Sequence, residues 1–329
     1  MALDILNGAA IRSLVSMEAC IDLMGETMRA VSRKEVTIPP RGIVAVGDQG
    51  NLYLDMPGAT RKPAAFGSKL LGYFPGNTTH PSIQGVIVLF DAATGAPVAI
   101  VDAVSVTAIR TAAASGLATR LLARKDASTL AILGTGVQAE EHLRAMRAVR
   151  PIRRVLVWGR SPDKAEAFAM RHRASAGVEI AAVPDAKSAV ERADIVCTVT
   201  ASPTPILEGR WLKPGAHLNL VGAFTPTTRE ADTEAIRRSR LFVEIREFAL
   251  REAGELVIPM GEGAIAATHV AGEIGEVVAG TVAGRTSPDE ITAYKSLGNV
   301  AQDLATAAFA REQAASRKVP GVTRIDDFG

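Results

Sequence analysis

The spacing of hydrophobic positions changes twice in the first part of the chain. Between Ile21 and Val31 apolar residues recur at helical intervals, and Ser16 can cap the start of that helix. Shorter apolar runs, separated by turns rich in Gly, Pro and Asn, then predict β-strands at 41–46, 52–56, 64–71, 84–91 and 97–102. This part of the chain is therefore predicted to be mostly antiparallel β-structure, and helical spacing returns at 103–124.

From residue 129 onward, short apolar runs alternate with segments of helical period. Strands are expected at 130–133, 154–158, 178–183, 194–198, 217–221 and 241–244, and helices at 137–150, 162–173, 186–192 and 230–238. Such alternation is typical of a parallel, doubly wound sheet. The remainder is predicted to be largely helical, with one long Ala-rich helix at 291–310.

Composition narrows the class of protein. Because 47% of the 329 residues are hydrophobic and only 4% are aromatic, the core must consist largely of Ala, Val, Leu and Ile. A net charge of +2 does not favour nucleic acid or a membrane surface as partner. Cys20 and Cys197 form no redox or metal-spaced pair, the five histidines show no metal-ligand spacing, and no signal peptide or spanning segment is evident. We therefore expect a soluble, cytoplasmic protein without a metal.

The basic segment 144–154 is the one local concentration of positive charge that needs an interpretation. It lacks interleaved aromatic residues and any nucleic-acid-binding motif. We interpret these arginines as a solvated helix end, complementary to the helix dipole.

A glycine-containing turn follows the strand expected at 130–133. Gly134 permits a tight turn, Gly136 lets the backbone approach phosphate groups, and Ala139 allows close packing of helix on strand. The motif alone is a weak signal, but the required flanking strand, helix and second strand are all predicted around it. We expect a dinucleotide at this turn, bound by Gly134, Thr135, Gly136, Val137 and Gln138.

The end of the second strand bears on which dinucleotide binds. An NAD site usually carries Asp or Glu about 20 residues beyond the glycine motif, where it binds the ribose hydroxyls. Here Arg160, Ser161 and Lys164 occupy that region, and such groups can bind a 2′-phosphate. The alternative is that Arg160 and Lys164 are solvated surface charges. NADP(H) is favoured, and NAD(H) remains an alternative.

Three cations in the first part of the chain are candidates for the part of the chemistry that a dinucleotide does not supply. Arg41 follows two prolines, whereas Lys69 and Arg110 lie within otherwise apolar segments. Burying an unpaired charge costs on the order of several kcal/mol, so each needs an anionic partner or a functional cleft. Considered singly, each is more simply a structural ion pair.

Segments that match a known protein family occur in order along nearly the whole chain, and they favour a functional role for the three cations over a structural one. The matching segments are 54–58, 67–69, 84–91, 94–97, 107–113, 134–139, 219–223, 229–230 and 295–298. With them the sequence resembles the ornithine cyclodeaminase and mu-crystallin family. The resemblance implies a Rossmann domain at 114–295 and a substrate-binding and dimerisation domain at 1–113, which the C-terminal segment 296–329 joins. The expected fold class is α/β: a Rossmann-type parallel sheet plus an α+β domain with a mainly antiparallel sheet, in a homodimer.

The resemblance also implies roles for individual residues. Arg41 and Arg110 would hold the α-carboxylate of a substrate, and Lys69 would line the same site. Ser82 matches a family Thr or Ser near the substrate. The further cofactor contacts expected are Thr111, Val221 and Gly298 around the nicotinamide, together with Thr200.

One departure from the family pattern bears on the reaction. Ornithine cyclodeaminases carry an Asp, regarded as a base, two residues before the proline of a Gly-Gly-Asp-Cys-Pro segment. The aligned segment 222–226 has Phe224 at that place, and Phe cannot accept a proton. The sequence therefore looks more like the imine reductases of the family, notably Δ1-pyrroline-2-carboxylate (ketimine) reductases. Phe224 is expected in the substrate site, where it suits a small apolar ring.

The expected reaction is hydride transfer from NADPH or NADH to the C=N carbon of Δ1-pyrroline-2-carboxylate or Δ1-piperideine-2-carboxylate, giving the L-amino acid. Lys69 is the candidate acid for the imine nitrogen, with its pKa lowered by the neighbouring arginines. Alternatively, Lys69 binds only the carboxylate and water delivers the proton.

Three other functions stay open at this point. The first is reduction of an acyclic imino acid, as in an alanine dehydrogenase or an iminosuccinate reductase. The latter needs a further cation, which His80, Arg61 or Lys62 can supply. Ornithine cyclodeamination and a non-catalytic, mu-crystallin-like binding function are less favoured.

Overall fold

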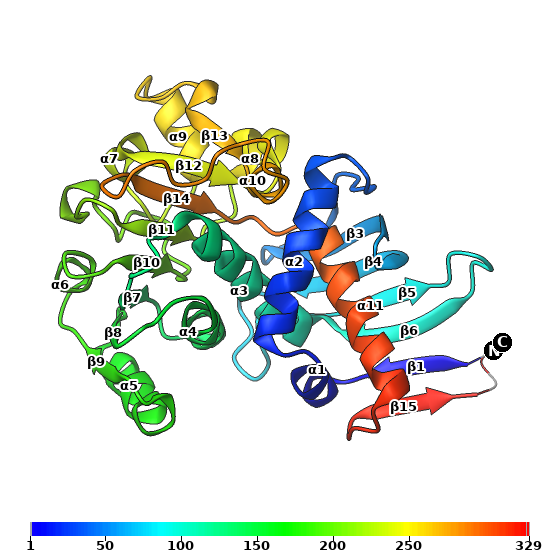
Figure 1. The fold of residues 1–329 in the computed structure, drawn as a ribbon. Helices are drawn as coiled ribbons and strands as arrows, with labels where there is room; N and C mark the ends of the chain where they lie inside the picture. Colours follow the sequence, from blue (N-terminus) through cyan, green and yellow to red (C-terminus); the bar gives the residue numbers. More distant parts are fainter. Residues whose placement is uncertain (1, 327, 329) are drawn as a thin grey trace. The chain divides into compact units, whose positions relative to one another are not determined.

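The chain forms two compact units (Figure 1), and the computed structural model describes residues 2–326 and residue 328. The first unit comprises Met1–Arg110 and Gly298–Gly329, and the second comprises Thr111–Leu297. The boundaries expected from the sequence lie within a few residues of these. Residues 1, 327 and 329, which belong to the predicted domain ranges, lie outside the described residues. The roles assigned to the two domains stay predictions.

A seven-stranded mixed sheet forms the centre of the first unit, in the order β15-β1-β6-β5-β4-β3-β2. Its strands are β1 (Leu3–Leu6), β2 (Gly42–Val46), β3 (Asn51–Arg61), β4 (Ala64–Tyr73), β5 (Ile83–Phe90), β6 (Pro97–Asp102) and β15 (Val322–Ile325). Neighbours pair antiparallel, except that β1 and β6 are parallel. The predicted strands are confirmed, whereas β1 and β15 were missed because four residues are too few to show alternation.

The helices of the first unit are α1 (Gly8–Leu14), α2 (Met17–Ser32), the start of α3 (Ala103–Leu122) and α11 (Val300–Ser316). Ser16 caps α2 as expected, since its hydroxyl accepts a hydrogen bond from the Ala19 amide. Helix α11 packs against α2 and against β3, β4 and β5 (Figure 1). This contact places side chains of α11 against the inner face of the sheet.

An eight-stranded, fully parallel sheet forms the second unit, in the order β13-β12-β14-β11-β10-β7-β8-β9. The strands are β7 (Thr129–Leu133), β8 (Arg154–Trp158), β9 (Glu179–Ala182), β10 (Ile195–Thr198), β11 (His217–Leu220), β12 (Ser239–Val243), β13 (Val270–Glu273) and β14 (Ile291–Lys295). Because β8 and β9 continue on one side of β7 while β10 and β11 continue on the other, the order of a Rossmann-type sheet is present. The predicted α/β fold class is confirmed.

The helices of the second unit connect these strands. They are the rest of α3, then α4 (Val137–Val149), α5 (Pro162–Ala176), α6 (Ala186–Val190), α7 (Thr233–Arg238), α8 (Arg246–Glu252), α9 (Gly254–Gly261) and α10 (Ile274–Val278), with short 3₁₀ turns at Gly209–Trp211 and Ala267–His269. The buried core cluster of this unit consists of Ala, Leu, Val and Ile side chains, as the composition suggested. Of the helices in the described part of the chain, none is long and apolar enough to cross a membrane.

The predicted helix at 291–310 is wrong in its first part. Residues Ile291–Lys295 form β14, which is completely buried between β11 and β12. The chain then turns at Gly298, which has a φ of +76°, and α11 begins after Asn299, whose side chain caps it. A strand that is buried on both faces need not alternate apolar and polar residues, so its pattern cannot be distinguished from that of a buried helix.

The interpretation of the basic segment as uniformly solvated is also wrong at one residue. Arg150 is buried, and its guanidinium donates to the carbonyl oxygens of Thr119, Ala123 and Arg124 at 2.7, 2.8 and 2.7 Å. These carbonyls lie at and just beyond the end of α3, where helical amide donors run out; those of Thr119 and Arg124 also accept from the Ala123 and Ala127 amides, and the guanidinium adds a further donor. Arg150 therefore caps α3.

Candidate functional site

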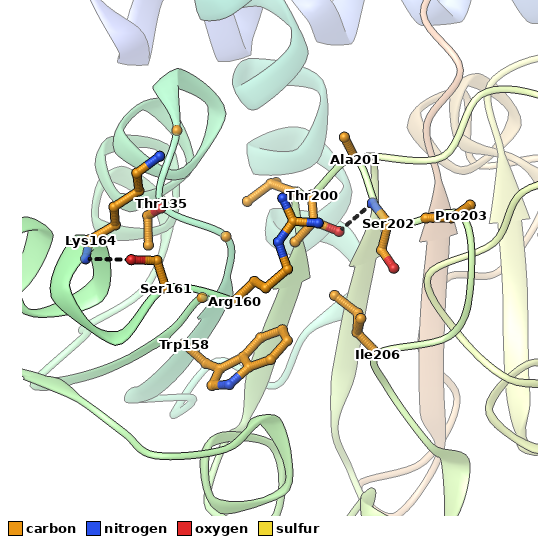
Figure 2. A pocket seen from close by; sticks show the side chains of 14 residues that line it. Thr135, Trp158, Arg160, Ser161, Lys164, Thr200, Ala201, Ser202, Pro203 and Ile206 are labelled. Atoms are coloured by element: carbon orange, nitrogen blue, oxygen red, sulfur yellow. Dashed lines mark hydrogen bonds between the residues drawn. The ribbon is translucent and has the colours of Figure 1, made fainter.

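A pocket of about 450 Å³ opens in the second unit where β7, β8 and β10 end (Figure 2). It is lined by Gly134, Thr135, Gly136, Trp158, Gly159, Arg160, Ser161, Lys164, Val199, Thr200, Ala201, Ser202, Pro203 and Ile206. The strand order reverses between β7 and β10, and ligands of open α/β sheets bind outside the carboxyl ends of strands at such a point. The pocket therefore lies beside the glycine turn, at the place where the sequence predicts a dinucleotide.

Two glycines of the turn after β7 shape this pocket in different ways. Gly134 has a φ of +133°, and a Cβ there would lie 2.7 Å from the carbonyl oxygen of Val199. Only glycine lets the turn approach the segment after β10 so closely. A Cβ at Gly136 would meet no atom within 4 Å, and Gly136 caps α4 without a side-chain hydrogen bond. The first turn of α4, which Val137 and Gln138 open, is thus suited to an anion.

The chain at the end of β8 contributes two cations, one hydroxyl group and one aromatic ring to the pocket lining. They belong to Arg160 and Lys164, to Ser161, and to Trp158. Arg160 and Lys164 are exposed, and in Figure 2 the Arg160 side chain extends into the middle of the lining. Ser161 caps α5, and its hydroxyl accepts a hydrogen bond from the Lys164 amide at 3.4 Å (Figure 2). None of the described residues that line the pocket is Asp or Glu.

In the first unit a buried carboxylate joins two of the predicted substrate-site cations. Lys69 on β4 donates from Nζ to Asp303 Oδ1 at 3.0 Å, and Arg110 on α3 donates from Nε to the same oxygen at 2.8 Å. All three side chains are buried. Arg110 Nη1 also donates to Gln302 Oε1 at 2.9 Å. The cluster holds two positive charges and one negative charge.

Asp303 and Gln302 were missed by the sequence analysis. Two buried cations demanded an anionic partner, and a Gln-Asp pair inside an Ala-rich helix was the available signal. The partner could not be chosen from the sequence, because Asp303 lies 234 positions from Lys69 and 193 from Arg110.

The environment of Lys69 lowers its pKa from the ordinary 10.5 to about 8. Burial is the largest cause, because it disfavours the charged form. The charge and hydrogen bond of Asp303 act in the opposite direction, whereas the positive charges of Arg110 and Arg41 lower the pKa. The direction expected from the sequence is therefore right, but burial contributes more than the arginines.

The other residues predicted for the substrate site are Arg41, Ser82 and Phe224, and they lie on three different segments of the chain. Arg41 is half-buried just before β2, and Ser82 is exposed just before β5, where its carbonyl accepts from the Phe74 amide at 2.7 Å. Phe224 follows β11 in the second unit and is 48% exposed. The structure thus brings Lys69 and Arg110 together on Asp303, with Arg41 close enough to act on the Lys69 charge.

The remaining predicted cofactor residues are distributed over both units. Thr200 lines the pocket of the second unit, Thr111 is buried in α3, and Val221 follows β11. Gly298 belongs to the first unit, and a Cβ there would lie 2.6 Å from Arg110 Nη1. Gly298 therefore leaves room for the guanidinium that Asp303 and Gln302 hold.

Fold and site together define the class of protein: a two-domain α/β protein with a Rossmann-type sheet, a glycine-lined pocket at its switch point and a buried cationic cluster in the other domain. The sequence model of the ornithine cyclodeaminase/mu-crystallin family matches residues 2–318. The chain belongs to this family, and the resemblance stated from the sequence is confirmed.

Relatives and solved structures are similar over nearly the whole chain. A Δ1-pyrroline-2-carboxylate reductase of Bacillus cereus is 35% identical, with 94% of this chain and 95% of the relative covered. The structure of a Thermococcus litoralis Δ1-pyrroline-2-carboxylate reductase in complex with NADH and L-proline has a TM-score of 0.91 at 37% identity, covering 95% of this chain and 97% of that one. An archaeal alanine dehydrogenase dimer with bound NAD has a TM-score of 0.92 at 31% identity and covers all of both chains.

We predict that Gly298→Ala destabilises the protein more than the strain of its backbone explains. The added methyl group meets the Arg110 guanidinium and displaces it from its partners, so the free energy of unfolding should fall by about 2–4 kcal/mol. Gly280→Ala is the matched control, because Gly280 has a φ of +74° and open space around it. It should cost about 1 kcal/mol. Equal losses for both variants in urea denaturation would contradict the prediction.

Proposed function

We propose that this protein is an NAD(P)H-dependent imine reductase that converts a cyclic 2-imino acid, Δ1-pyrroline-2-carboxylate or Δ1-piperideine-2-carboxylate, into the L-amino acid. The observation that carries the proposal is the buried cluster of Lys69, Arg110 and Asp303, which has one cation in excess. Its excess charge suits the carboxylate of an imino acid. Similarity to the Bacillus and Thermococcus reductases supports the same reaction.

The pocket residues fit a nicotinamide dinucleotide. The turn and helix start formed by Gly134, Thr135, Gly136, Val137 and Gln138 would hold the pyrophosphate. Thr111, Val221 and Gly298 are the proposed contacts around its nicotinamide, and Thr200 is a further proposed contact of the dinucleotide. When bound, the dinucleotide supplies the hydride that the imine carbon accepts.

On the substrate side, Arg41 and Arg110 would bind the carboxylate and orient the imine, with Phe224 as an apolar contact of the ring. Lys69 would donate a proton to the imine nitrogen. A pKa of about 8 leaves Lys69 mostly protonated at pH 7 yet ready to release a proton. In the alternative, Lys69 binds the carboxylate and water provides the proton.

NADP(H) is the dinucleotide we favour. Arg160, Ser161 and Lys164 supply positive charge and a hydroxyl at the end of β8, and no carboxylate among the described lining residues is available to bind the ribose hydroxyls. The Thermococcus reductase and the archaeal alanine dehydrogenase carry NADH and NAD, so NAD(H) is the second candidate.

We also propose a homodimer, in which the outer face of the first unit's sheet contacts a second copy. Lys69 faces α11, so its neighbour Leu70 faces outward, and Val86 pairs with Leu70. On the same face, Val44 pairs with Tyr53, and both are more than one-third exposed. Exposed apolar side chains gathered on one sheet face are typical of a subunit interface. A monomeric mass in sedimentation equilibrium would contradict the proposal. Cys20 and Cys197 are both buried thiols, which suits the proposed cytoplasmic location.

A second candidate function is reduction of an acyclic imino acid, favoured by the similarity to an archaeal alanine dehydrogenase. An iminosuccinate reductase needs another cation, and Arg61, Lys62 and His80 are all exposed in the first unit. Cyclodeamination is disfavoured by Phe224, which cannot act as a base. A purely binding function would not need the paired Lys69 and Arg110.

The substrate proposal predicts rapid NADPH oxidation with Δ1-pyrroline-2-carboxylate. Its kcat/KM should exceed that for pyruvate plus ammonia or oxaloacetate plus ammonia by about a hundredfold, because a rigid ring loses less conformational freedom on binding than an acyclic imine does. The rates are measured by absorbance with NADPH and with NADH. Turnover of only an acyclic mixture would replace the proposal with the second candidate, and absence of all turnover would favour a binding function.

The role of Lys69 predicts a pH dependence that Asp303 controls. For reduction, kcat/KM should be constant below about pH 8 and fall tenfold per pH unit above it, as Lys69 loses its proton. In Asp303→Asn the stabilising charge is removed, so the Lys69 pKa falls further and the decline should start at lower pH. Glu312→Gln, an exposed change on the same helix, is the control. Protonation of the substrate itself is common to all three proteins, so identical profiles would refute the role of Lys69 as acid.

Charge reversal tests the cofactor preference. Arg160→Asp should raise the KM for NADPH by about 10- to 100-fold and change that for NADH far less, because only NADPH carries the 2′-phosphate. Arg171→Asp, an exposed change on α5, controls for the general loss of positive charge. Equal changes for both cofactors in Arg160→Asp would argue against the phosphate contact.

A further inference from the structure

A second buried charge cluster lies in the second unit, outside the residues that line its pocket. Glu230, Glu255 and Lys295 are all almost completely buried. Lys295 Nζ lies 3.0 Å from Glu255 Oε2, and Glu255 Oε1 accepts a hydrogen bond from the Glu230 amide at 3.0 Å. The three residues come from the end of β14, the first turn of α9 and the segment before α7, so only the fold brings them together.

Glu230 accepts hydrogen bonds from both ends of the segment 199–206, which forms one wall of the pocket. Its Oε1 accepts from the amide and the hydroxyl of Thr200, at 2.7 and 2.6 Å. Its main-chain carbonyl accepts from the Ile206 amide at 2.8 Å. Thr200 and Ile206 both line the pocket, and the Thr200 hydroxyl also accepts from the Ser202 amide at 3.1 Å (Figure 2). The wall 199–206 is therefore held at its two ends by a single residue.

The same carboxylate also holds the loop after β11. Glu230 Oε2 accepts from the Gly222 amide at 2.7 Å, and Lys295 donates to the carbonyl of Ala223. A Cβ at Gly222 would lie 2.0 Å from the Thr200 carbonyl oxygen, so this loop packs directly on the pocket wall. Phe224 follows two residues later.

Packing alone does not require such a cluster. Buried charges lose their hydration, and apolar residues of similar size often serve stability as well or better. Burial raises the pKa of Glu230, and the hydrogen bonds from Thr200 and the charge of Lys295 oppose that change. The donors that Glu230 satisfies belong to two loops beside the pocket, which indicates that the carboxylate fixes their geometry.

We propose that Glu230 is a positioning residue for the dinucleotide pocket, holding the wall 199–206 and the loop that carries Phe224 in one arrangement, with Lys295 and Glu255 supporting it. The inference rests on the part of the proposed function that places a nicotinamide dinucleotide in this pocket. It does not depend on which imine is reduced.

Glu230→Gln tests the proposal with little change in size. The amide can accept from one loop, but its NH₂ group then faces a donor of the other, so one loop is released. The dissociation constant of NADPH, measured by fluorescence titration of the purified protein, should rise about tenfold or more. Glu247→Gln, an exposed carboxylate on α8, is the matched control and should leave the affinity unchanged.

Thr200→Val keeps the test decisive if Glu230→Gln fails to fold. It removes one of the donors to Glu230 and should raise the dissociation constant severalfold. Where Glu230→Gln folds, the two effects should be less than multiplicative in the double variant, because both changes break the same contact; fully multiplicative effects would mean that Thr200 acts on the dinucleotide independently of Glu230 and would count against the proposal. A lowered melting temperature with affinities within twofold of the wild type would show a merely structural role and overturn the proposal.

The outcomes separate this inference from the proposed reaction. A wild-type protein that binds NADPH or NADH but reduces none of the imines refutes the reaction, and the affinity ratios of the variants still decide the role of Glu230. If the wild type binds neither dinucleotide, the inference is refuted whatever the variants do.

Discussion

The hydrogen bonds that the Asp303 carboxylate accepts hold together the buried charges of the first unit, and the proposed substrate chemistry depends on them. Lys69 and Arg110 both donate to one of its oxygens, and neither cation is exposed to water. Without Asp303 two like charges would share a buried space, which disfavours the charged form of Lys69. The shared oxygen also sets the direction in which both donors point, and Gln302 fixes the guanidinium from a second side.

The two buried clusters differ in their balance of charge, and this difference suits different tasks. Around Asp303 there is one cation in excess, which matches the carboxylate of the proposed substrate. Around Lys295 there is one carboxylate in excess, and the backbone amides of Thr200 and Gly222 satisfy it from within the protein. A cluster that is short of an anion can recruit a ligand, whereas one whose excess charge is already satisfied can only hold the chain in place.

Much of the second unit follows from local pattern. The turn Gly134–Gln138, the strands on either side of it and the basic end of β8 could all be predicted, because glycine conformations, apolar periodicity and strand–helix alternation depend on neighbouring residues. The same reasoning failed at Ile291–Lys295, where burial on both faces removes the alternation that distinguishes a strand from a helix. It also failed at Arg150, whose partners lie on another helix.

By itself, the sequence determined the α/β class, the position of the glycine turn after β7 and the requirement that Lys69 and Arg110 have a partner. Only the tertiary structure decided that the partner is Asp303, that Gly298 leaves room for the Arg110 guanidinium, and that Glu230 joins two loops. The reason is physical: a periodic pattern is carried by adjacent residues, whereas the cost of a buried charge is met by whichever group the fold brings within hydrogen-bond distance.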